Sequence, residues 1–170
     1  MNKIINQDFF KKDSETVALE LMKSNLVRKI KGKEIKLEVN EIEIYDGFLD
    51  KASHASSGKT KRNEVMFKGG GIFYIYLVYG MYFMINIVTG KENYPSAILI
   101  RGAGDLNGPG KLSNYLKVDY SLNGKEIGEK NGLWFEKIQN KVEIKKTSRI
   151  GVNYAGNYWS KAPLRFLKIR

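Results

Sequence analysis

The spacing of apolar residues in the first part of the chain predicts a helix. Val17, Ala18, Leu21 and Met22 fall on one face at helical spacing, and Ser14 precedes them as the expected N-cap. A serine hydroxyl in that place accepts a hydrogen bond from a backbone N–H of the first turn. We therefore expect one amphipathic helix before residue 25.

A strand pattern follows. Leu26 to Ile30 and Glu34 to Tyr45 are β-like, and Lys31-Gly32-Lys33 between them predicts a hairpin turn. In the second strand the apolar residues take odd positions in the first half and even positions after Asn40. This inversion predicts one of two things, a bulge at Asn40-Glu41 that swaps the faces or a strand end buried on both sides.

The middle of the chain alternates between loop and strand. Asp46 to Gly71 is polar and poorly periodic, which predicts a long surface connection, either functional or disordered. Ile72 to Val78 and Met81 to Val88 read as two strands of a hairpin broken at Tyr79-Gly80. A third strand, Ala97 to Ile100, is expected to end at Arg101.

The last third predicts a short helix and a mixed tail. Gly108-Pro109-Gly110 precedes apolar residues at helical spacing, and the basic tail from Trp134 contains strand-like Val142 to Ile144 and Leu164 to Leu167. We expect one compact α+β domain over residues 1–170, mainly an antiparallel sheet with a protruding β-hairpin and flanking helices.

Composition and charge narrow the function classes. The chain has 170 residues, 42% of them hydrophobic, which is enough for one core. Its formal net charge of +11, from 29 Lys+Arg against 18 Asp+Glu, fits a polyanionic partner or a lysine-rich surface that only keeps the protein in solution. With no cysteine and His54 as its one histidine, the chain offers neither disulfides nor the ligand set of a zinc site, so we expect no metal site built on thiolates or histidines.

The apolar run Ile72 to Val88 raises the question of a membrane span. It contains tyrosines and Asn86 and falls short of the ~20 residues that a spanning helix needs, so we interpret it as sheet core. The N-terminal segment also lacks the apolar stretch of a signal peptide. We expect a cytoplasmic protein, without a membrane partner.

Glu43 is the first candidate for chemistry. It lies between Ile42 and Ile44 and near Tyr45, which makes it a candidate for a general base in a partly dry pocket. The alternative is a bulged edge strand whose Glu43 points at water.

Tyr79 is the second candidate. At the tip of a hairpin in a basic protein, a tyrosine suits wedging between bases, with Tyr76 on the strand behind it. For Tyr74 and Tyr82 we expect ordinary sheet core. On its context alone, His54 is a solvent-facing, capping or catalytic histidine.

Taken in order, these features resemble the alkyladenine (3-methyladenine) DNA glycosylase family. The tyrosine hairpin followed by Asn86 is the most diagnostic part. The resembling segments are Glu41–Tyr45, His54, Thr60–Asn63, Met66–Phe67, Tyr74–Phe83, Asn86, Leu99–Arg101, Gly108–Leu112 and Lys161–Phe166.

The resemblance implies roles for these residues. Glu43 matches the general base that activates water, and Arg101 the arginine that helps hold that carboxylate and water. Tyr45, His54 and Tyr76 match the pocket that stacks and hydrogen-bonds a flipped base.

Further roles concern the DNA. Tyr79 matches the minor-groove wedge, and Asn86 the residue that rejects guanine by crowding its 2-amino group. Arg62, Gly110 and Lys111 are candidates for contacts with the DNA backbone, although the glycines at Gly108–Gly110 also fit a plain helix cap.

The implied function is a monofunctional DNA glycosylase of base excision repair without lyase activity. It would act as a monomer, without cofactor, on double-stranded DNA that contains 3-methyladenine or 7-methylguanine, with hypoxanthine and ethenoadenine as further candidates. The sequence departs from the family in its short Gly102–Asn107 segment and in Tyr154, where histidine is common. The alternative is a non-catalytic DNA- or RNA-binding module that uses the basic surface and the tyrosines.

Overall fold

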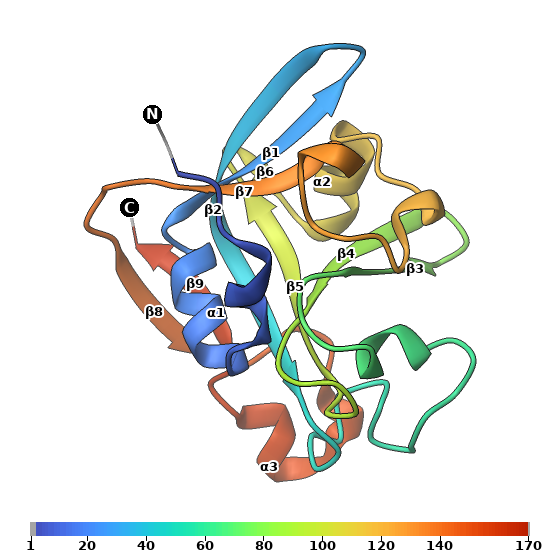
Figure 1. Cartoon of the computed structure of the whole chain (residues 1–170). Coiled ribbons are helices and arrows are strands. Elements are labelled where there is room, and N and C mark those ends of the chain that lie inside the picture. The colour runs from blue at the N-terminus through green and yellow to red at the C-terminus, as the bar shows by residue number, and fades with distance from the viewer. Residues whose placement is uncertain (1–2, 170) are drawn as a thin grey trace.

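Strand β2 (Lys33–Asp46) is the longest strand of the computed structural model, which describes residues 3–169 (Figure 1). Its first half pairs with β1 (Ser24–Ile30) as the expected hairpin. Its second half pairs with β5 (Ser96–Ala103) and also with β9 (Arg165–Ile169). The end of β2 therefore has neighbouring strands on both sides.

The other strands extend this sheet. In residues 3–169 it has nine strands in the main order β3-β4-β5-β2-β1-β7, with β6 on β5 and β8 on β9. Every pairing between these strands is antiparallel. The expected α+β fold with a mainly antiparallel sheet is confirmed. The remaining bounds are β3 (Phe73–Val78), β4 (Tyr82–Val88), β6 (Leu106–Asn107), β7 (Leu133–Lys137) and β8 (Glu143–Thr147).

Short helices flank the sheet (Figure 1). The predicted N-cap of the first helix is wrong by one residue, because Asp13 caps α1 and Ser14 is its first helical residue. The Asp13 carboxylate accepts hydrogen bonds from the Thr16 N–H at 2.9 Å and the Thr16 hydroxyl at 2.6 Å, and its charge suits a helix N-terminus. The helices are α1 (Ser14–Leu21), α2 (Pro109–Tyr115) and α3 (Gly156–Lys161), with 3-10 turns η1 (Gln7–Lys11), η2 (Glu64–Phe67), η3 (Tyr120–Leu122), η4 (Glu129–Asn131) and η5 (Asn153–Ala155).

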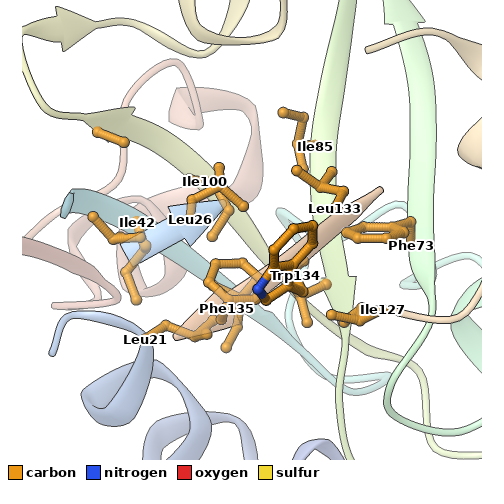
Figure 2. Packing of buried hydrophobic residues seen from close by; sticks show 14 of the residues in the cluster. Leu21, Leu26, Ile42, Phe73, Ile85, Ile100, Ile127, Leu133, Trp134 and Phe135 are labelled. Carbon is orange, nitrogen blue, oxygen red and sulfur yellow. The ribbon is translucent and has the colours of Figure 1, made fainter. Parts of the chain in front are cut away.

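The bulge in β2 decides which residues face the core. The register with β5 shifts between Val39 and Glu41 and again between Glu41 and Ile42, so the predicted bulge is confirmed. Beyond it, Ile42 and Ile44 join the main core with α1. Figure 2 shows Ile42 among the packed side chains of this core. Burying a side chain of this size stabilises the fold by roughly 1.5–3 kcal/mol. Glu43 is fully buried too, so this end of the strand is covered on both faces as well.

Two predicted features of the middle region need correction. The segment after β2 is not only a surface connection, because Val65, Met66 and Phe67 are buried in a second apolar cluster with Tyr74. The third strand does not end at Arg101, because β5 runs on to Ala103, where it pairs with β6.

The hairpin between β3 and β4 presents its tip to solvent. Tyr79 and Gly80 both have positive φ, 51° and 64°, as is required of the two central residues of a hairpin turn that matches the sheet twist. The Tyr79 side chain is 92% exposed. None of the helices in residues 3–169 has the length and apolar character needed to cross a membrane.

Candidate active site

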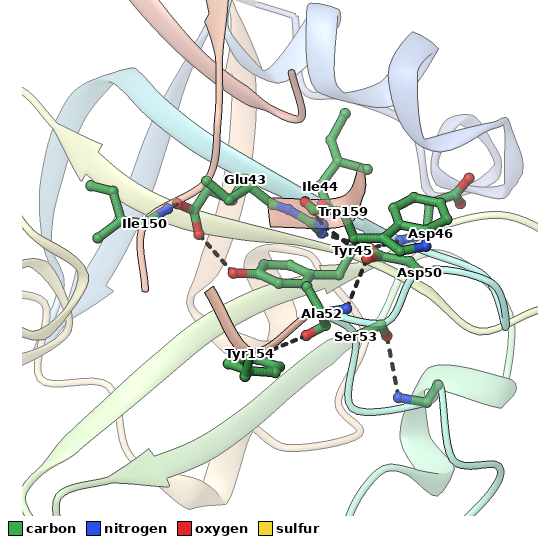
Figure 3. Close-up of polar contacts among 12 residues, drawn as sticks. Glu43, Ile44, Tyr45, Asp46, Asp50, Ala52, Ser53, Ile150, Tyr154 and Trp159 are labelled. Carbon is green, nitrogen blue, oxygen red and sulfur yellow. Dashed lines mark hydrogen bonds and ion pairs between the residues drawn. The ribbon is translucent and has the colours of Figure 1, made fainter. Parts of the chain in front are cut away.

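The carboxylate of Glu43 is buried and held at both oxygens. Oε2 accepts a hydrogen bond from the Tyr45 hydroxyl at 2.7 Å, and Oε1 accepts one from the backbone N–H of Ile150 at 2.7 Å (Figure 3). Burial, followed by the charge of Glu43, raises the pKa of Tyr45 far above its ordinary value, so its hydroxyl stays a neutral donor. The alternative in which Glu43 points at water is wrong.

Two arginines flank this carboxylate from the neighbouring strands. Arg101, on β5, donates from Nε to Oε1 of Glu41 at 2.9 Å and has Nη1 3.7 Å from Oε2 of Glu43. Arg165, on β9, donates from Nε to the same Glu41 oxygen at 2.7 Å. The predicted pair of Arg101 and Glu43 therefore lies together, but Glu41 is the closer partner of Arg101.

An aromatic cavity of about 90 Å³ lies beside Glu43. Both hydrogen-bond donors to Glu43, Tyr45 and Ile150, are among its lining residues. All four residues predicted for the base pocket line it, so the fold gathers them from a strand, a loop and a hairpin. The lining consists of Tyr45, Ala52, Ser53, His54, Met66, Tyr74, Tyr76, Asn86, Ala97, Ile150, Gly151, Val152 and Tyr154.

His54 is fixed by two tyrosines. Its Nδ1 lies 3.0 Å from the hydroxyl of Tyr74, and its ring meets the Tyr76 ring edge-on with 4.7 Å between centroids. His54 keeps an exposed surface, but its partial burial, followed by the charge of Arg62, lowers its pKa and favours the neutral imidazole. Tyr74 is buried as expected, but it belongs to the cavity wall as well as to the core.

Asn86 lies in the cavity wall with its amide committed to the backbone. Its Nδ2 donates to the carbonyls of Tyr74 at 3.1 Å and Met84 at 3.4 Å, and the side chain is buried. Burial raises the pKa of the adjacent Tyr76 to about 12, so this phenol is also neutral at physiological pH.

An open groove of about 520 Å³ adjoins the cavity and shares Tyr76, Ile150 and Gly151 with it. Tyr79, Arg101, Gly110 and Lys111, predicted from the sequence, all line this groove. Gly110 has a packing role besides, because a Cβ there would lie 2.8 Å from the ring of Tyr82. Tyr82, expected in the core, lines the groove instead.

Arg62 does not line the groove or the cavity. Its guanidinium lies over the Tyr76 ring, 5.4 Å from the centroid, while the residue is exposed. Tyr154 lines the cavity and donates from its hydroxyl to the Ala52 carbonyl at 2.8 Å.

The structure also shows a buried ion pair that was not predicted. Arg149 and Asp50, both fully buried, make two hydrogen bonds of 2.6 and 2.8 Å. The Arg149 guanidinium also donates to the Ile44 carbonyl at 2.9 Å and lies over the Tyr45 ring. The pair therefore ties the loop after β2 to the segment that carries Ile150.

Within residues 3–169, no three His, Asp or Glu side chains gather as a metal site would require.

Comparisons with known proteins show which family the chain resembles over most of its length. The family model described as methylpurine-DNA glycosylase matches residues 8–106 and 105–169. A protein of Desulfitobacterium hafniense assigned as a 3-methyladenine DNA glycosylase is 35% identical over 90% of this chain and 89% of its own. Proteins with the same assignment are 39% identical in Borreliella afzelii, over 86% of both chains, and 36% identical in Methanocella arvoryzae, over 90% of this chain and 86% of theirs.

These matches define the class of enzyme as hydrolases that act on N-glycosyl bonds in DNA. The chain belongs to the methylpurine-DNA glycosylase family.

Proposed function

We propose that this protein is a monofunctional glycosylase of base excision repair, acting as a monomer, that removes flipped-out alkylated purines with Glu43 as the general base. The observation that carries the proposal is the position of Glu43. Its carboxylate is buried and oriented by Tyr45 and Ile150, both of which line the aromatic cavity. A carboxylate held beside an aromatic cavity by two of its lining residues is placed to activate a water next to the sugar of a nucleotide bound there.

The chemistry needs few groups. Alkylation at N3 or N7 makes the purine cationic, so the glycosidic bond breaks with its electron pair going to the base and an oxocarbenium-like sugar remaining. Water then bonds to C1′ and gives its proton to Glu43, which leaves an abasic sugar and the free base. Each oxygen of Glu43 accepts one described hydrogen bond and keeps a further lone pair for that water. Arg101 helps hold the carboxylate and the water.

The aromatic walls of the cavity would give a preference for damaged purines. Tyr45, Tyr76 and His54 offer stacking faces and hydrogen bonds, and a cationic base over such a face gains roughly 0.5–2 kcal/mol. We propose 3-methyladenine and 7-methylguanine as cationic substrates. Hypoxanthine and ethenoadenine are proposed as further substrates that carry no charge. Asn86, in the cavity wall, would exclude guanine by crowding its 2-amino group.

The groove would hold the duplex. Tyr79 at the exposed tip would fill the space that the flipped nucleotide leaves, and Lys111, the Gly110 backbone and Arg62 would meet phosphates. The described residues lining the cavity include no lysine, which favours attack by water over an imine and hence no strand cleavage.

The test is product analysis with the wild-type enzyme. Duplexes with a single 3-methyladenine or 7-methylguanine should release the free base and keep an intact strand until alkali is added, whereas an unmodified duplex should release nothing. If the wild type binds the damaged duplex and releases no base, the protein is a binding module and the proposal fails.

A further inference from the structure

The proposed function assigns no role to Arg165, although this residue contacts the site. In the antiparallel pairing of β9 with β2, Arg165 is the direct partner of Glu43, so both side chains emerge on the same face. Arg101 approaches that face from β5, on the other side of β2. Glu43 therefore has one arginine on each neighbouring strand.

Glu41 holds both arginines in the same way. Each donates from Nε to Oε1 of Glu41, at 2.9 Å for Arg101 and 2.7 Å for Arg165. Of the terminal guanidinium nitrogens, only Nη1 of Arg101 has a further partner among residues 3–169, which is Glu43. The Glu41 side chain is 12% exposed, and those of Arg101 and Arg165 are 14% and 20% exposed.

This arrangement suits an anion. A guanidinium offers five N–H donors in a planar fork. Because Glu41 anchors Nε, the side chain has already lost most of its rotamer entropy and its terminal N–H groups are oriented before a ligand binds. Arginine pairs of this kind bind phosphate through charge-assisted hydrogen bonds. A pair that served only to hold Glu41 would not need terminal nitrogens that reach solvent.

We infer that Arg165, together with Arg101, binds a phosphodiester next to the flipped nucleotide, with Glu41 as the positioning residue that orients both guanidinium groups. The inference rests on the proposed function, in which Glu43 faces the sugar of that nucleotide. A phosphate is bonded to each side of that sugar, so donors beside Glu43 are within reach of one of them.

The test measures binding with one phosphate neutralised at a time. Duplexes carry a tetrahydrofuran abasic analogue, and a methylphosphonate replaces the linkage on its 5′ side or its 3′ side. Wild type should lose about ten- to hundredfold in affinity at one of the two linkages. Arg165→Gln should lose a similar factor on the unmodified duplex and no longer respond to that methylphosphonate.

Two further variants serve as controls. Lys23→Gln removes one positive charge at an exposed residue that follows α1. The apolar face of α1 packs against the other side of β2, so this variant should respond to the methylphosphonate as wild type does. Arg165→Lys keeps the charge but lacks the planar guanidinium, so it should also lose most of the affinity response to the methylphosphonate. If Arg165→Gln does not fold, Arg165→Lys provides the test. Wild-type affinity in Arg165→Gln, or an undiminished methylphosphonate effect in either Arg165 variant, would overturn the inference. Because only binding is read, this failure is distinct from an absence of base release by the wild type.

Discussion

The hydroxyl of Tyr45 donates a 2.7 Å hydrogen bond to Oε2 of Glu43, two residues earlier on the same strand. Residues at this spacing share one face of a strand, so the carboxylate and the aromatic wall are fixed by the same element. This hydrogen bond links the proposed general base to the proposed pocket for the flipped purine. Removing the hydroxyl alone tests its role.

Tyr45→Phe removes that hydroxyl and keeps the ring. We expect base release to fall by about tenfold or more, because a hydrogen bond to a charged group contributes roughly 1.5–3 kcal/mol and here orients the base. Single-turnover excision measures the effect. Tyr94→Phe is the matched control, since its hydroxyl contacts Asp46 at 3.4 Å and the residue does not line the cavity. Equal rates for Tyr45→Phe and wild type would show that this bond does not orient the carboxylate.

Tyr79→Asn removes the proposed wedge and keeps a residue that tolerates the positive φ of 51° at this turn. Because the side chain is 92% exposed, the free energy of unfolding should change by no more than about 0.5 kcal/mol. Excision should fall by about tenfold or more, as expected when one stacking contact with DNA is lost. Tyr158→Asn, an exposed tyrosine of α3, should excise like wild type. Unchanged excision by Tyr79→Asn would refute the wedge.

His54 is the one histidine of the chain, so its NMR titration gives a single, assignable curve. Burial and then Arg62 lower its pKa, and the midpoint should lie below the ordinary 6.5. Arg62→Gln should raise that midpoint by removing the repulsive charge. Because the unfolded chain binds this proton first as the pH falls, the His54 contribution to stability declines from about pH 6.5 down to the lowered pKa. A midpoint at or above 6.5 would contradict this account of the pocket.

Asp50→Asn breaks the buried pair with Arg149. We expect a loss of about 3–5 kcal/mol in the free energy of unfolding, because an unpaired arginine is left buried. Urea unfolding measures it, and Asp8→Asn, whose pair with Lys11 is exposed, is the control with little change expected. If Asp50→Asn were as stable as Asp8→Asn, the pair would not hold the loop to the segment that carries Ile150.

Much of the sheet could be predicted because its strands alternate and its turns have glycine at the required positions. Strand β7 was missed because Leu133, Trp134 and Phe135 are all buried and show no alternation. Helix α3 was missed because it has six residues, none of them buried, so no apolar stripe marks it.

The candidate site was predictable where one segment carries the signal. Glu43 and Tyr45 share a strand, and the bulge follows from the inverted pattern. Partners that meet only through the fold had no such signal. Asp50 and Arg149 are 99 residues apart, and Arg165 reaches Glu41 through the pairing of β9 with β2. The sequence contains no local pattern that links them.

The central claim is that Glu43 activates the water, and Glu43→Gln tests it most directly. The Tyr45 hydroxyl can turn and accept from the glutamine amide while Ile150 donates to its oxygen, so the fold should be kept. We predict that single-turnover release of 7-methylguanine falls by about 10²- to 10⁴-fold, the usual contribution of a general base. Affinity for an abasic-analogue duplex should stay within a few-fold, and the exposed Glu34→Gln on the same strand should release base at the wild-type rate. Release by Glu43→Gln at the wild-type rate would contradict the account.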